Sequence, residues 1–118
     1  MTEFINRKIT QAIENAAASF PVITITGPRQ SGKTTLARHM FPEYPYFSLE
    51  NPNVRNLAME DPVGFLNNTT EGIILDEVQN SPQLLSYIQG IVDNDYEKRF
   101  ILNAEKRITI ACRTLRCF

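Results

Sequence analysis

The sequence has few cysteines, no long apolar run and no recognisable leader. Two cysteines among 118 residues are too few for a disulfide framework, and 42% hydrophobic with 21% charged residues excludes a disordered or collagenous chain. No segment approaches the ~20 consecutive apolar residues of a membrane-spanning helix. The first residues lack the apolar stretch of a secretory signal. We therefore expect one globular, cytoplasmic domain without membrane contact.

Charge is balanced overall but not along the chain. The net charge of −1 does not indicate nucleic acid as a partner. Residues 98–118, however, hold six of the twelve basic side chains, one acidic side chain and both cysteines, Cys112 and Cys117. Because this spacing with one distant His39 fits no zinc pattern, we interpret the cysteines as free thiols.

Apolar spacing and turn residues predict an alternating order of helices and strands. Asn51, Asp61 and Ser81 each precede a proline, which is typical of a helix start. Helices are predicted over residues 3–18, 33–40, 52–60, 62–68 and 82–93. Strands are predicted over residues 22–26, 46–49, 72–77 and 100–102. Such alternation favours an α/β fold in which helices cover both faces of a parallel sheet.

A phosphate-binding loop is the most specific motif in the sequence. The pattern G-x4-G-K-[ST] is matched by Gly27, Pro28, Arg29, Gln30, Ser31, Gly32, Lys33 and Thr34. A predicted strand runs into the motif and a predicted helix follows it, which is the context that such loops require. Glycines let backbone N–H groups approach phosphate oxygens closely, and the helix adds its positive end.

Individual side chains of the loop have predicted roles. Lys33 is expected to contact the β- and γ-phosphates, and the Thr34 hydroxyl is a suitable ligand for Mg²⁺. Thr35 is expected to bind the α-phosphate. Arg29 either braces the loop through a carboxylate or contacts phosphate itself.

An acidic pair follows the apolar strand that begins at Gly72. In a parallel sheet, Asp76 would lie in the crevice that holds the phosphate loop, where it would hold Mg²⁺ through the water shell of the ion. Glu77 is placed to orient and deprotonate the attacking water. Two further residues stay open: Asn103 either senses the γ-phosphate or simply ends a strand, and Gln79 either contacts the attacking water or begins a turn.

These motifs together resemble a known family. The segment from Phe20 to Leu36, the segment from Tyr46 to Pro52 and the run Leu75-Asp76-Glu77-Val78-Gln79 are similar to prokaryotic AAA-type ATPases of the AAA+ superfamily. These ATPases usually carry a C-terminal domain of the DUF4143 kind. The resemblance implies a three-layer RecA/AAA-like core, ATP and Mg²⁺ as ligands, and ATP hydrolysis.

The resemblance ends after residue 102. We therefore expect residues 1–102 to be the N-terminal part of a truncated P-loop ATPase domain, and residues 103–118 to be a frame-shifted or otherwise aberrant basic tail. Without a fifth core strand, the strand Val22–Thr26 would have an unpaired outer edge. Marginal stability and self-association are the expected consequences.

Three functions remain open from the sequence. The first is an ATPase domain in which Lys33 and Glu77 are catalytic. The second is a nucleotide-binding remnant without turnover, because no arginine that completes the γ-phosphate site can be assigned. The third is a P-loop protein similar to a small-molecule kinase, which would need an arginine-bearing lid and an acceptor pocket.

Overall fold

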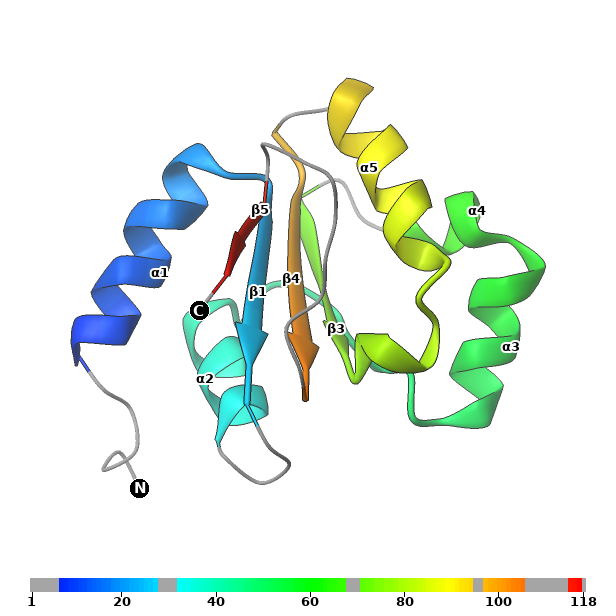
Figure 1. The fold of residues 1–118 in the computed structure, drawn as a ribbon, viewed down its shortest axis with the longest axis horizontal. Helices are drawn as coiled ribbons and strands as arrows, with labels where there is room; N and C mark the ends of the chain where they lie inside the picture. The colour runs from blue at the N-terminus through cyan, green and yellow to red at the C-terminus, as the bar shows by residue number, and fades with distance from the viewer. Residues whose placement is uncertain (1–6, 28–31, 68–70, 95–96, 106–114, 118) are drawn as a thin grey trace.

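The core of the protein is a parallel β-sheet. The computed structural model describes residues 7–27, 32–67, 71–94, 97–105 and 115–117. Its strands are β1 (Val22–Thr26), β2 (Tyr46–Ser48), β3 (Gly72–Asp76), β4 (Arg99–Ala104) and β5 (Leu115–Cys117). They lie in the order β2-β3-β4-β1-β5, and every pairing between neighbours is parallel (Figure 1). Parallel neighbours need crossover connections, which the helices supply.

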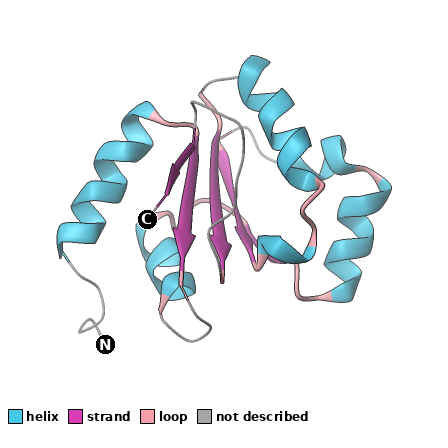
Figure 2. Ribbon diagram, viewed as in Figure 1, coloured by secondary structure: helices cyan, strands magenta, loops and turns pink. Residues whose placement is uncertain are grey.

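Helices cover both faces of the sheet, as Figure 2 shows. One face is covered by α1 (Arg7–Ser19) and α2 (Lys33–Met40). The other is covered by α3 (Pro52–Glu60), α4 (Pro62–Leu66) and α5 (Leu84–Asn94). A short 3₁₀ helix, η1 (Val78–Asn80), follows β3. The predicted three-layer α/β architecture is confirmed.

Side-chain alternation along the strands builds two separate cores. In β3, Ile73 and Leu75 belong to the cluster under α3–α5, whereas Ile74 belongs to the cluster under α1 and α2. In β4, Leu102 belongs to the cluster under α3–α5 and Ile101 to the cluster under α1 and α2. All five side chains are fully buried, as expected for strands covered on both faces.

The helix starts at Pro52 and Pro62 form as predicted. The Asn51 side chain accepts from the N–H of Asn53 at 2.9 Å, and the Asp61 side chain accepts from the N–H of Gly64 at 3.1 Å. These bonds satisfy donors that a helix N-terminus leaves unpaired.

Some predicted boundaries differ from the structure. The helix expected from residue 82 begins at Leu84, because the N–H groups of Leu84 and Leu85 each donate to the carbonyl three residues back, on Ser81 and Pro82, and so form a turn before the α-helix. The helix expected to residue 68 ends at Leu66, and residue 68 lies outside the described residues. Of the first helix, residues 3–6 also lie outside them. The strand expected over 100–102 extends from Arg99 to Ala104, so the boundary expected after residue 102 falls inside β4.

The expectation of an unpaired outer edge on β1 is wrong. β5 pairs there in parallel, with Val22 opposite Leu115, Ile23 opposite Arg116 and Thr24 opposite Cys117. The C-terminal segment therefore supplies the fifth strand that we expected to be missing. This pairing also removes the reason for expecting self-association through that part of β1.

No helix among the described residues combines the length and the apolar character needed to cross a bilayer.

Candidate nucleotide and metal site

The phosphate loop leaves the sheet at the carboxyl end of β1. The N–H of Gly27 donates to the carbonyl of Ala104 at 3.1 Å, which ties the end of β1 to the end of β4. Gly27, Gly32, Lys33, Thr34 and Thr35 are described by the structure. The other predicted loop residues, Pro28, Arg29, Gln30 and Ser31, lie outside the described residues.

Gly32 sets the start of α2. Its φ of 90° is left-handed, a conformation that glycine adopts without steric cost. Its carbonyl then accepts from the N–H of Leu36 at 2.9 Å, so α2 begins immediately. The first residue of the helix, Lys33, is 5% exposed. A cation and the positive end of a helix thus lie together beside the loop, which is a favourable place for an anion.

Asp76 is the last residue of β3 and is hydrogen-bonded to residues of α2 and β2. Its Oδ2 accepts from the Thr34 hydroxyl and from the Tyr46 hydroxyl, each at 2.6 Å. Its Oδ1 accepts from the N–H of Glu77 at 2.9 Å. Asp76 is only 5% exposed, and these three donors compensate the cost of burying a carboxylate. Thr34, predicted as a metal ligand from the phosphate loop, and Asp76, predicted as one from the acidic pair, are therefore in direct contact.

Glu77 has an unusual backbone for a side chain of its size. Its φ is 52° and its ψ 46°, and it is the one non-glycine residue with positive φ among the described residues. Its Oε1 accepts from the Gln79 amide at 2.7 Å. Such strain costs roughly 1–3 kcal/mol and is concentrated at functional sites. Gln79, which the sequence left open, thus holds the side chain of Glu77.

Asn103 is completely buried near the end of β4, opposite Ile25 of β1. Strand alternation places its side chain on the face of Ile101, which is the α1 and α2 face. Among the described residues, neither Oδ1 nor Nδ2 of Asn103 has a hydrogen-bond partner. Leaving a buried amide unsatisfied costs free energy, so this amide requires an explanation beyond ordinary strand packing.

Tyr46 is the site residue that sequence reasoning missed. Its ring packs against the cluster under α1 and α2. Its hydroxyl, however, reaches Asp76. Burial and, to a smaller extent, the hydrogen bond to Asp76 together raise the pKa of Tyr46 to about 12. Finding it would have required the parallel register, in which Tyr46 lies opposite Ile74, two residues before Asp76.

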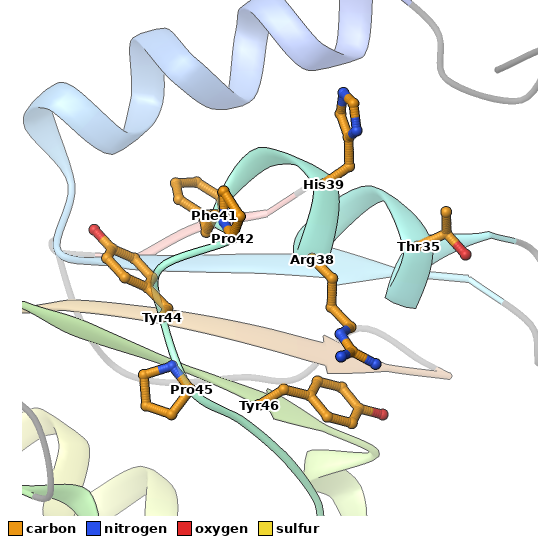
Figure 3. A pocket seen from close by; sticks show the side chains of 8 residues that line it. All are labelled: Thr35, Arg38, His39, Phe41, Pro42, Tyr44, Pro45 and Tyr46. Carbon is orange, nitrogen blue, oxygen red and sulfur yellow. The ribbon is translucent and has the colours of Figure 1, made fainter.

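An open groove of about 730 Å³ runs along α2 beside this site (Figure 3). Thr35 lies at one end of α2 in this view, and Phe41 and Tyr44 stack at the other, with ring centroids 5.3 Å apart. The guanidinium of Arg38 lies 4.8 Å from the centroid of the Tyr46 ring. The predicted α-phosphate ligand Thr35 is exposed and lines this groove.

The donor set fits Mg²⁺ better than a cation that needs a protein cage. Among the described residues, no group of three His, Cys, Asp or Glu side chains is placed to hold a metal. Mg²⁺ is typically bound by one or two protein oxygens, with waters and substrate phosphates completing its octahedron. The Thr34 hydroxyl and the Asp76 carboxylate are two such oxygens.

A protein-family comparison identifies the domain. The family model described as "AAA domain" matches residues 19–109. The chain belongs to this AAA domain family. It is therefore a P-loop ATPase-like domain, and the family match includes both the loop and the acidic pair.

Two curated relatives of this AAA domain are uncharacterized proteins of Mycobacterium bovis and Mycobacterium tuberculosis. Each is 36% identical over 89 residues, which is 74% of this chain and 20% of the relative. The chain thus spans about a fifth of the length of these relatives.

Solved structures support the same fold. A signal transduction ATPase with numerous domains from Pyrococcus horikoshii superposes with a TM-score of 0.58 at 18% identity, covering 95% of this chain and 22% of that one. The DnaC helicase loader superposes with a TM-score of 0.55 at 16% identity, covering 90% and 75%. For PCH-2 of C. elegans the TM-score is 0.50 at 14% identity, covering 93% and 40%. At these identities the likeness concerns the fold alone.

Proposed function

We propose that this AAA domain binds ATP with Mg²⁺ and hydrolyses it. The observation that carries the proposal is the hydrogen bond between Thr34 at the start of α2 and Asp76 at the end of β3. It brings the phosphate-binding helix and a carboxylate to one point, next to a buried lysine. Family membership and the fold support the same function.

Binding of the triphosphate would use backbone and side-chain groups together. The N-terminus of α2 and the Lys33 ammonium would attract the β- and γ-phosphates, and the motif from Gly27 to Gly32 is proposed to add backbone N–H donors. Thr34 and Asp76 would hold Mg²⁺, which when bound supplies positive charge that offsets the charge of the phosphates. Thr35 is proposed to bind the α-phosphate.

Hydrolysis would depend on Glu77. Its carboxylate accepts a proton from a water molecule while the water oxygen attacks the γ-phosphorus, and the bond from the γ-phosphorus to the bridging oxygen breaks to release ADP. The hydrogen bond from Gln79 and the backbone conformation fix the direction of this carboxylate. The buried, unpartnered amide of Asn103 is proposed to bind the γ-phosphate or the water.

The experiment compares phosphate release from ATP by the parent and Glu77→Gln, with ATP binding measured on both by calorimetry. We expect the variant to bind ATP as the parent does and to release phosphate roughly 10²-fold or more slowly, as for loss of a general base. Glu14→Gln, an exposed carboxyl on α1, is the matched control and should keep the parent rate.

Two results would overturn parts of the proposal. Equal background rates for parent and Glu77→Gln, with ATP binding retained, would show a domain that binds nucleotide without turnover. Absence of ATP binding by the parent would overturn both binding and hydrolysis.

A further inference from the structure

The carboxylate of Asp76 has almost no free acceptor capacity. An ionised carboxylate offers about four acceptor positions, two on each oxygen. Thr34 and Tyr46 occupy Oδ2, and the N–H of Glu77 occupies one position on Oδ1. Within the described part of the chain, one position therefore remains, on Oδ1. A metal-bound water can approach Asp76 at that position without displacing a donor.

Thr34 and Glu77 belong to motifs that the sequence already explains, but Tyr46 does not. Tyr46 comes from β2, at the opposite edge of the sheet from β5. Pairing with β3 fixes its backbone, and Arg38 of α2 lies against its ring. In Figure 3 the Tyr46 hydroxyl points away from Tyr44. The Tyr46 ring is thus held in place, and its hydroxyl donates to the buried carboxylate of Asp76.

We propose that Tyr46 is a positioning residue for the magnesium site. It acts through Asp76, whose carboxylate it holds by a hydrogen bond. Its hydroxyl occupies the second position of Oδ2 and fixes the plane of the carboxylate, which would keep the remaining position of Oδ1 available to a water of the metal. The inference rests on the proposed function and adds a residue to it. Groups that orient metal ligands through hydrogen bonds typically affect metal affinity by about 10- to 100-fold.

A purely structural role for Tyr46 makes a different prediction. Loss of its hydroxyl would then weaken folding or ATP binding regardless of metal. A positioning role instead changes how strongly Mg²⁺ and ATP support each other, which is a coupling between two ligands.

The test measures that coupling in the full chain. The Kd for ATP is determined by calorimetry in EDTA and in excess Mg²⁺, and the ratio of the two values is compared between the parent and Tyr46→Phe. This substitution keeps the ring and its contact with Arg38 but removes the hydroxyl. We expect the ratio to fall about tenfold, with the Kd in EDTA changed less than about twofold.

Tyr44→Phe is the matched control. Tyr44 lines the same groove and stacks on Phe41, and its pKa is raised by burial, yet it does not contact Asp76. Its ratio should equal that of the parent.

Each other outcome overturns the inference. An unchanged ratio in Tyr46→Phe, or equal weakening in EDTA and in Mg²⁺, would show that Tyr46 does not position the metal site, while ATP binding by the parent would leave the proposed function intact. No ATP binding by the parent, or no effect of Mg²⁺ on it, would defeat the proposed function and this inference together.

Discussion

The Thr34 hydroxyl donates a 2.6 Å hydrogen bond to Oδ2 of Asp76, across 42 residues of sequence. This contact joins the helix that follows the phosphate loop to the end of β3, which β4 separates from β1. Because Asp76 is also the acceptor for Tyr46 and for the backbone of Glu77, it is both the expected metal-holding group and a structural hub. Substitution at Asp76 should therefore affect metal use and stability together.

Asp76→Asn tests that double role. The amide cannot accept from all three donors, so we expect the free energy of unfolding to fall by about 1–3 kcal/mol and the effect of Mg²⁺ on ATP binding to be lost. Urea denaturation and calorimetry measure the two effects. Asp93→Asn is the control, because within the described residues Asp93 accepts a single exposed bond, from Gln89 at 3.1 Å; it should change stability by less than about 0.5 kcal/mol. Equal effects of the two substitutions would contradict this role of Asp76.

Alkaline titration tests the environment of Tyr46. Its pKa of about 12 in the folded protein lies above the ordinary value of 10.0, mainly because burial disfavours the phenolate. The folded protein thus binds this proton more tightly than the unfolded chain. The stability that it contributes is complete below pH 10 and is lost as the pH rises towards 12. Absorbance of the phenolate should show a late-titrating tyrosine in the parent that is absent from Tyr46→Phe.

Two glycines should respond in opposite directions to alanine. At Gly72, a Cβ would lie 2.6 Å from the Tyr44 ring and 2.8 Å from the Arg99 carbonyl oxygen, which β-sheet pairing holds in place. We expect Gly72→Ala to lower the free energy of unfolding by about 1–3 kcal/mol. At Gly90 of α5 nothing lies within 4 Å of such a Cβ, so Gly90→Ala should raise it by roughly 0.5–1 kcal/mol. Thermal denaturation that finds Gly72→Ala as stable as the parent would contradict this packing of Tyr44 against β3.

Asn103→Val separates a functional amide from a structural one. Valine suits a strand and removes two buried polar atoms without partners. Stability should therefore stay equal or rise, while phosphate release should slow at least about tenfold if the amide binds the γ-phosphate or the attacking water. A large loss of stability with an unchanged rate would show that Asn103 serves the fold.

Local signals predicted most of the fold. The β-branched run of β1, the helix after the phosphate loop and the proline-marked start of α3 each depend on nearby residues, and their bounds at 22–26, 33–40 and 52–60 match the structure. The start of α5 was missed by two residues, because Ser81 and Pro82 accept hydrogen bonds of a turn, from the residues three ahead, before the α-helical pattern begins at Leu84.

The rest depended on contacts between distant segments. The pairing of Leu115–Cys117 with β1 could not be predicted, because a strand of three residues is too short to show an alternating pattern of apolar and polar residues. The basic composition around it suggested an aberrant tail instead. The role of Tyr46 required the relative register of β2 and β3, which a hydrophobic pattern does not encode. For the phosphate loop the sequence remains the better guide, since four of its residues lie outside the described part.

Calorimetric titration of ATP with excess Mg²⁺ into the parent and Lys33→Ala tests the central claim most directly. Lys33 is the buried cation at the N-terminus of α2, and a charge-assisted contact of this kind contributes about 1.5–3 kcal/mol, which is roughly 10- to 100-fold in Kd. Circular dichroism checks that the variant folds, and Lys8→Ala, an exposed lysine on α1, controls for the lost charge. The account predicts a rise in Kd of roughly 10- to 100-fold for Lys33→Ala and none for Lys8→Ala. A folded Lys33→Ala that binds ATP as tightly as the parent would contradict it.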